Sequence, residues 1–247
     1  MINNFSIINI HEKPKLKSKL SSQMLYGEKF KIINNKSNWL KIKTDYDKYI
    51  GYIRKKNYLK KFNPTFKVCS PKSHIFVKKN NKLKKTSKFL YFASCIPKIN
   101  ENKNFLEFEK NKWIKKKDIK KINHKEKSFS KIFKLFLKTK YVWGGKTFKG
   151  IDCSALLQVF NYYNENYYPR DTVDQIRYSK RKSITNNFKK GDIIFWKGHV
   201  AMCLNSKELI HAYGPEKKVL IMPIFQTIKR IEETAKLKVK KISYIKY

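Results

Sequence analysis

Short apolar segments alternate with turns along the first half of the chain. Strand-length runs rich in β-branched and aromatic residues recur at 30–33, 39–43, 49–53, 75–77, 89–93, 105–108 and 112–114. Such runs, separated by polar turn residues, are typical of β-strands. Their spacing is that of small β-barrels, so we expect two such units in tandem, over residues 1–62 and 63–120.

The second half has a different pattern. It follows a polar, basic stretch at 120–127 that we interpret as a linker. Ser128 can cap a helix whose apolar positions share one face: 129, 132, 133, 136 and 137. A second helix is expected over Cys153–Tyr163. Strands are then expected at 192–196, 199–204, 208–212, 219–223 and 242–246, the last two as a β pair. Helices followed by an antiparallel sheet predict an α+β domain over residues 128–247.

Composition narrows the class of partner. The chain has 247 residues, of which 41% are hydrophobic, so it can bury a core. The net charge of +40 by itself suggests nucleic acid, an anionic membrane or an anionic polymer as partner. Only five of the 58 basic residues are Arg, the residue suited to bidentate recognition. We therefore interpret the charge as a solvated surface and expect neither a nucleic-acid nor a membrane partner.

The start of the chain and its cysteines bear on its compartment. Residues 1–7 lack the regions of a signal peptide, and no apolar run approaches the roughly 18 residues of a membrane helix. We expect a cytoplasmic protein. The four cysteines, at 69, 95, 153 and 203, lack CxxC and zinc-ligand spacing, so we expect reduced thiols, no metal and no cofactor. The oligomeric state stays open.

Cys153 is the candidate nucleophile. It falls on the first turn of its expected helix, where unpaired backbone N–H groups and the helix dipole stabilise a thiolate. The same N–H groups can receive an oxyanion. The turn at Gly144–Gly145 lets backbone approach this site closely. The alternative is that Cys153 is only a small buried hydrophobe.

Two histidines can partner this thiol. His199 begins one expected strand and His211 lies near the end of the next. If these strands pair antiparallel, the two side chains become neighbours on one face. His199 can then share the proton of Cys153, while His211 orients the His199 ring. The alternative is that both are structural residues of the sheet.

Six blocks of residues carry a resemblance to a known family. They are Tyr141–Gly145, Gly150–Ser154, Pro169–Gln175, Gly191–Trp196, His199–Val200 and Ile210–Ala212. In this order and spacing they resemble the NlpC-type family of papain-like cysteine peptidases, which cut bacterial cell-wall peptides. Two positions depart from the family pattern, because Ala155 and Ala201 stand where Gly is usual. Both are small, so we expect the chemistry to be retained.

The resemblance implies a role for each matched residue. Cys153 is the nucleophile, His199 the general acid and base, and His211 the residue that orients His199. Tyr141 matches a tyrosine whose hydroxyl lies in the active site. The matched blocks also imply substrate contacts by Trp143 and Ser154.

The first part resembles a bacterial SH3-like domain. This resemblance covers about residues 8–60, and a second, divergent copy is expected over 63–120. The fold class expected is therefore α+β, a papain-like catalytic domain preceded by two small SH3-like β-barrels. This combination resembles dipeptidyl-peptidase VI-type enzymes, which are γ-D-glutamyl-L-diamino acid endopeptidases acting on murein peptides with a free N-terminal L-Ala.

In that subfamily an acidic residue and its neighbours bind the free amino terminus of the substrate. The matched residues are Asp171 and Thr172, with Glu28 and Tyr49 in the first SH3-like domain. A buried ammonium needs a carboxylate partner, in agreement with this role. The alternatives are that Asp171 caps a helix, Glu28 is a surface turn residue and Tyr49 is an ordinary barrel residue.

We expect an enzyme that recycles murein peptides. Whether their third residue is diaminopimelate or lysine stays open. One alternative is an exported hydrolase that acts on intact peptidoglycan. Another is a binding module for an anionic polymer whose catalysis has been lost.

Overall fold

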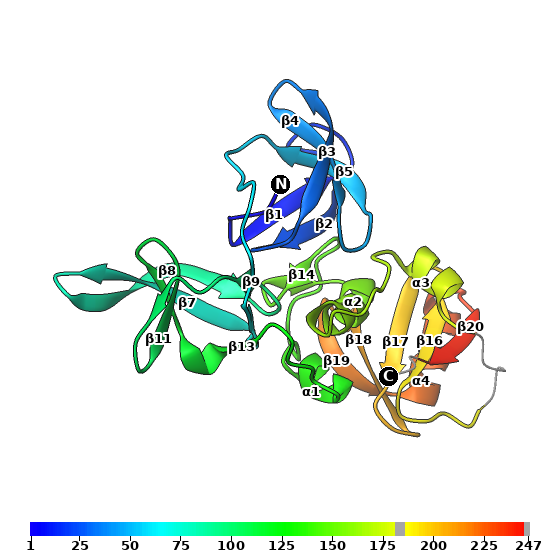
Figure 1. Cartoon of the computed structure of the whole chain (residues 1–247). Helices are drawn as coiled ribbons and strands as arrows, with labels where there is room; N and C mark the ends of the chain where they lie inside the picture. Colours follow the sequence, from blue (N-terminus) through cyan, green and yellow to red (C-terminus); the bar gives the residue numbers. More distant parts are fainter. Residues whose placement is uncertain (181–185, 245–247) are drawn as a thin grey trace. The chain divides into compact units, whose positions relative to one another are not determined.

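The chain folds into two compact units, Met1–Lys125 and Glu126–Tyr247. Their computed structural model describes residues 1–180 and 186–244 (Figure 1). The division falls within the basic stretch 120–127. The start of this stretch is not a free linker, because Ile119–Lys121 forms strand β13 and pairs with β6 (Phe66–Val68).

The first unit begins with a five-stranded antiparallel sheet in the order β2-β1-β5-β4-β3. Its strands are β1 (Ile7–His11), β2 (Leu20–Leu25), β3 (Phe30–Lys36), β4 (Trp39–Thr44) and β5 (Ile50–Arg54). Alternate side chains face one core, as the two-residue period of a strand requires. That core contains Ile8, Ile10, Met24, Phe30, Leu40, Ile42, Ile53 and Tyr58.

A second antiparallel sheet follows in the order β10-β11-β12-β7-β8, beside a small sheet β13-β6-β9. The remaining strands are β7 (Lys72–Lys79), β8 (Lys82–Tyr91), β9 (Cys95–Ile96), β10 (Asn100–Glu101), β11 (Phe105–Glu109) and β12 (Lys112–Lys115), with a 3-10 turn at Lys116–Asp118. Their core contains Val68, Ile75, Leu90, Ile96, Leu106, Phe108, Ile114 and Ile119. Tyr26, in the turn directly after β2, also belongs to this core, and its hydroxyl lies 3.3 Å from Glu109 Oε2.

The expected closed barrels are not found in the described part of the first unit. The pairings of the first sheet end at β2 and β3, and every β3 residue after Phe30 is exposed. A closed barrel would instead pair its two edge strands with each other. The two predicted SH3-like barrels are therefore not confirmed as such, although both β-rich regions exist.

The second unit contains a five-stranded antiparallel sheet in the order β19-β18-β17-β16-β20 (Figure 1). Its strands are β16 (Asp192–Trp196), β17 (His199–Cys203), β18 (Glu208–Tyr213), β19 (Lys218–Pro223) and β20 (Lys241–Tyr244). All five predicted strands are present, although residues 245–246 of the last lie outside the described residues. The predicted final β pair is wrong, because β19 and β20 form opposite edges of the sheet.

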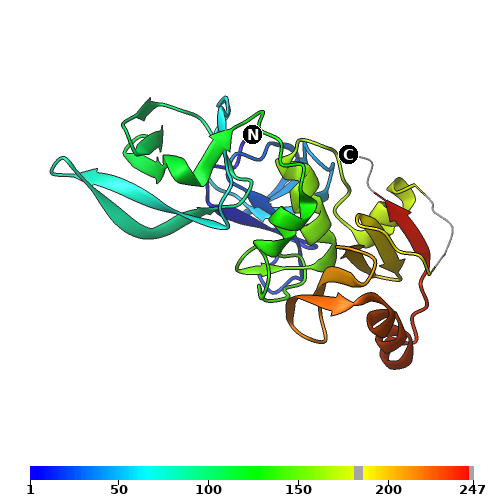
Figure 2. The same cartoon turned by 90° about the horizontal axis from the view of Figure 1, so that it is seen from below.

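Four α-helices complete the second unit: α1 (Phe129–Lys134), α2 (Cys153–Tyr163), α3 (Thr172–Tyr178) and α4 (Ile224–Ala235). The first two were predicted, and Ser128 caps α1 by accepting a hydrogen bond from Lys131 N. Helix α2 is buried along almost its whole length and packs against β17 and β18. Helix α4 packs against β19 (Figure 2). No helix in the described ranges is long and apolar enough to cross a membrane.

Candidate active site

The segment before α2 is a tight β-hairpin that sets where the helix begins. Strands β14 (Lys146–Thr147) and β15 (Gly150–Ile151) pair with each other. A Cβ atom on Gly145 would lie 2.5 Å from Gly150 O and 2.9 Å from Val142 O, so no other residue fits there. Gly145 is therefore packed closely against the backbone of this hairpin. The turn also contacts the residue before Cys153, because Asp152 N donates to Gly145 O at 3.4 Å.

A buried ion pair holds the start of α2. Arg170 Nη1 and Nη2 donate to Asp152 Oδ1 and Oδ2 over 3.0 and 2.6 Å. Asp152 is also the N-cap of α2, since its Oδ1 accepts from Ala155 N at 2.8 Å. Its Oδ2 accepts from Gly144 N at 2.9 Å. One carboxylate therefore joins the glycine turn, the helix start and the Pro169–Arg170 segment around Cys153.

Ser154 and Gln175 extend this network. The Ser154 hydroxyl donates to Asp152 Oδ1 at 3.1 Å and accepts from Arg170 Nη1 at 2.9 Å. Gln175 Nε2 donates to the backbone oxygens of Ser154 and Pro169, each at 2.9 Å. These contacts give Ser154 a structural role, and its expected contact with substrate stays a prediction. The positioning roles of Asp152, Arg170 and Gln175 were missed, although all three belong to the matched blocks.

The Cys153 thiol lies at the edge of β17, beside His199. Its Sγ is 4.0 Å from Gly198 O and makes hydrogen bonds with Val200 N–H and the Thr172 hydroxyl. Residues 198 and 200 flank His199, so the thiol is next to the backbone of that residue. Within the described residues no hydrogen bond joins Sγ to the His199 ring, and such contacts often form only when substrate binds.

Burial controls the ionisation of this thiol. Only 4% of Cys153 is exposed, and burial, followed by the charge of Asp152, raises its pKa to about 12. The hydrogen bonds and the Arg170 charge only partly oppose this shift. The thiolate stabilisation expected from the helix N-terminus does not offset this shift. Desolvation outweighs the helix, and the resting group is a neutral thiol.

The two expected histidine partners are neighbours on the sheet. Strands β17 and β18 pair antiparallel, as predicted, with Met202 opposite Ile210. His199 Nε2 lies 3.0 Å from His211 Nδ1, and the ring centroids are 5.1 Å apart. Burial lowers the pKa of His199 to about 4. Burial also lowers the pKa of His211, with smaller contributions from the charges of His199 and Arg230. Both imidazoles are therefore neutral at pH 7.

The other residues of the second unit that were expected at the site differ in their contacts and exposure. Thr172 contacts the thiol. Tyr141 is close enough for the Cys153 charge to raise its pKa, although burial is the larger cause. Asp171 precedes α3 but makes no capping hydrogen bond, so helix capping does not account for it. Trp143 is 53% exposed.

Glu28 and Tyr49 belong to the first unit, where both serve local structure. Glu28 is buried, contrary to a surface turn residue, and its Oε1 accepts from Leu25 N at 2.8 Å. The Tyr49 hydroxyl donates to Ser21 O at 3.4 Å, and its ring packs against the first core. Their expected contact with substrate stays a prediction.

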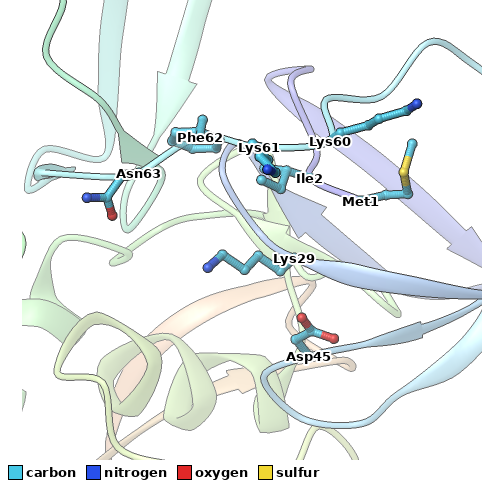
Figure 3. A pocket seen from close by; sticks show the side chains of 8 residues that line it. All are labelled: Met1, Ile2, Lys29, Asp45, Lys60, Lys61, Phe62 and Asn63. Atoms are coloured by element: carbon cyan, nitrogen blue, oxygen red, sulfur yellow. The ribbon is translucent and has the colours of Figure 1, made fainter.

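A surface hollow of about 430 Å³ lies in the first unit (Figure 3). Three exposed lysines and Asp45 line it together with Met1, Ile2, Phe62 and Asn63. It contains no nucleophile, and its lysines belong to the positive charge found all along the chain. In residues 1–180 and 186–244, no three His, Cys, Asp or Glu side chains are grouped as metal ligands would be.

Comparisons with known proteins assign both regions to families. Residues 138–233 match the NlpC/P60 family, and residues 10–57 match the bacterial dipeptidyl-peptidase SH3 domain. A γ-D-glutamyl-L-lysine dipeptidyl-peptidase of Bacillus subtilis is 24% identical over 85% of this chain and 77% of its own length. A probable endopeptidase NlpC homologue of Haemophilus influenzae is 33% identical over 35% of this chain, which spans about half (49%) of that relative.

The fold agrees with a solved structure. The crystal structure of an NlpC/P60 family protein from Bacillus cereus covers 90% of this chain and 93% of its own, with a TM-score of 0.78 and 20% sequence identity. At this identity the likeness concerns the fold. The match supports the architecture on which Cys153, His199 and His211 are placed.

The buried ion pair predicts a large effect of a conservative change. In Arg170→Lys the charge remains but the bidentate contact with Asp152 is lost, so the free energy of unfolding should fall by about 2–3 kcal/mol. Urea unfolding at pH 7 measures this. Arg177→Lys is the matched control, because its pair with Asp174 is exposed and should contribute little. Equal effects of the two variants would contradict the role given to Asp152–Arg170.

The depressed histidine pKa values predict acid sensitivity. Between pH 6.5 and about 4, His199 and His211 bind protons in the unfolded chain but stay unprotonated in the folded protein. The free energy of unfolding therefore falls as the pH falls through this window. The expected loss from His199 is about 2 kcal/mol, a discounted figure because the residue as a whole is only partly buried. Urea midpoints at pH 7, 6, 5 and 4 test this. His211→Gln should flatten the dependence, and an unchanged slope would refute the assignment.

Proposed function

Because the chain carries an NlpC/P60 cysteine peptidase domain together with a bacterial dipeptidyl-peptidase SH3 domain, we propose that it is a γ-D-glutamyl-L-diamino acid endopeptidase. Its proposed substrates are murein peptides with a free N-terminal L-Ala. Two relatives support this choice: the Bacillus subtilis enzyme and a dipeptidyl-peptidase 6 of Lysinibacillus sphaericus, which is 25% identical over 83% of this chain.

The observation that carries the proposal is the placement of the Cys153 thiol against the backbone on both sides of His199. His199 Nε2 is hydrogen-bonded to His211, so Nδ1 is the ring nitrogen that remains for the thiol. This placement supports Cys153 as nucleophile, His199 as base and His211 as orienting group, the three roles that acyl transfer requires.

In the proposed reaction, Cys153 Sγ gives its proton to His199 Nδ1 and attacks the γ-D-glutamyl carbonyl carbon. Backbone N–H groups on the first turn of α2 donate to the oxyanion. His199 then returns the proton to the leaving amine as the C–N bond breaks. A water molecule gives a proton to His199 and attacks the thioester, which releases the acid and restores the thiol.

The neutral resting pair fits this sequence of steps. With a thiol pKa of about 12 and a His199 pKa of about 4, transfer of the proton before substrate binds is strongly unfavourable. Proton transfer is therefore coupled to attack on the carbonyl, when negative charge moves from sulfur to the oxyanion.

Selection for a free amino terminus is proposed to come from Asp171. Its carboxylate belongs to the residue before Thr172, whose hydroxyl contacts the thiol. A substrate ammonium removed from water needs such a partner to offset its desolvation. Peptides with a free amino terminus are fragments already released from the wall, which supports a role in recycling and a cytoplasmic location as parts of the same proposal.

Removal of the thiol tests the proposed chemistry. Cys153→Ala should reduce turnover of L-Ala-γ-D-Glu-diaminopimelate or the lysine analogue more than about 1,000-fold, because no other group can form the thioester. Product release is followed by liquid chromatography. Cys69→Ala, a cysteine of the first unit, should keep wild-type turnover. No turnover by the wild type, or unchanged turnover by Cys153→Ala, would end the peptidase proposal.

Substitution of Asp171 tests the proposed specificity. Asp171→Asn should raise KM for the free-amine peptide by at least about tenfold while leaving an N-acetylated peptide unaffected, since only the ammonium needs the carboxylate. Asp174→Asn, on the exposed side of α3, is the control. If the wild type cleaves both peptides equally well, the proposal gives way to a hydrolase of intact peptidoglycan.

A further inference from the structure

The buried His211 ring has one partner at each nitrogen. Within residues 1–180 and 186–244, Nδ1 lies 3.0 Å from His199 Nε2 and Nε2 lies 3.3 Å from the sulfur of Met222. The side chain is fully buried, so solvent does not supply another partner. The thioether is therefore the group that faces the far side of this imidazole.

The register of the sheet places Met222 there. Strands β18 and β19 pair antiparallel, with Leu209 opposite Met222 and His211 opposite Leu220. Residues two apart on a strand face the same side, so Met222 is the diagonal neighbour of His211 on one face. Strand β19 ends one residue later, at Pro223, and Ile224 N donates to Lys207 O at 2.8 Å. This bond fixes the end of the strand that carries Met222.

The contact between the two histidines allows two proton arrangements. In one, His199 carries its proton on Nε2, donates to His211 Nδ1 and keeps Nδ1 free to accept the thiol proton. In the other, His211 donates from Nδ1 to His199 Nε2, and His199 carries its proton on Nδ1. Only the first arrangement leaves His199 able to act as the base, because an Nδ1 that already has a proton cannot accept another.

The sulfur of Met222 distinguishes these arrangements. In the first, His211 carries its proton on Nε2 and donates to the sulfur, which is a weak acceptor. In the second, the Nε2 lone pair of His211 would face the sulfur lone pairs at 3.3 Å and find no donor. A buried polar atom without a partner is costly, so the thioether favours the first arrangement.

We propose that Met222 is a positioning residue that selects the Nε2–H tautomer of His211, and thereby keeps His199 Nδ1 free to accept the proton of Cys153. The catalytic part of this inference rests on the peptidase function proposed above. The tautomer itself does not, because it is a property of the folded protein without substrate.

The surroundings hold the His211 ring in one plane and, chiefly through burial, keep it neutral. Tyr213 stacks on it with an interplanar angle of 8° and a centroid separation of 4.7 Å. The Arg230 guanidinium lies 5.7 Å from the other partner in the stack, the Tyr213 ring centroid, and pairs with Glu216 at 2.7 Å. The positive charges of Arg230 and of a protonated His199 oppose protonation of His211. The choice is therefore between two neutral tautomers.

Three variants of β19 test the proposal. Met222→Leu keeps the volume but removes the acceptor, so the Nδ1–H tautomer should become populated and kcat should fall roughly tenfold with KM unchanged. Met222→Gln places an amide oxygen within reach of the same nitrogen and should restore both the tautomer and kcat. Leu220→Val is the control for packing. Leu220 lies on β19 like Met222 and opposite His211, and its substitution changes packing without changing hydrogen bonding.

The readouts are steady-state kinetics on the free-amine peptide and the ¹⁵N chemical shifts of His211 in each protein. In the wild type Nε2 should be protonated and Nδ1 should not be, and kcat should follow the Nε2–H fraction across the variants. The proposal is overturned if wild-type His211 is protonated on Nδ1, or if Met222→Leu leaves the tautomer as Leu220→Val does. If wild-type His211 has the Nε2–H tautomer but the protein shows no turnover, the proposed function is wrong and the tautomer assignment still holds.

Discussion

The bidentate contact between Asp152 and Arg170 is the interaction on which the site depends. It joins three segments that are separate in sequence: the glycine turn at 144, the start of α2 and the stretch before α3. Both side chains are almost fully buried, so the two charges are desolvated and each needs the other. Loss of either partner would weaken the anchoring of the helix end that carries Cys153, although Gln175 still joins Ser154 to Pro169.

Burial has opposite effects on the pKa values of the proposed nucleophile and the proposed base. It raises the pKa of the Cys153 thiol and lowers that of His199, since a charge on either group is poorly solvated there. A helix N-terminus alone would favour a thiolate, but its effect is limited to the first turn and is the smaller one here. The site is consequently held in an uncharged state, with the proton on sulfur until a carbonyl can accept the negative charge.

Local patterns in the sequence predicted what depends on nearby residues. The cap at Ser128, helix α2 and the strands β16 to β18 follow from periodicity and ordered motifs, whereas the cap at Asp152 was missed. Helix α4 was missed, although its buried positions Ile224, Thr227 and Ile231 have the i, i+3, i+7 spacing of an amphipathic helix. Barrel closure, the edge positions of β19 and β20 and the thiol pKa depend on contacts distant in sequence. No local pattern marked Met222, since a methionine on a strand is ordinarily a core residue.

The burial and protonation of the Cys153 thiol also affect its sensitivity to oxidation. Peroxides and electrophiles attack the thiolate form of cysteine, and they attack exposed groups fastest. A Cys153 that is 4% exposed and protonated at rest meets neither condition. In the proposed reaction, the burial that delays ionisation until a peptide binds therefore also protects the thiol from oxidation between turnovers.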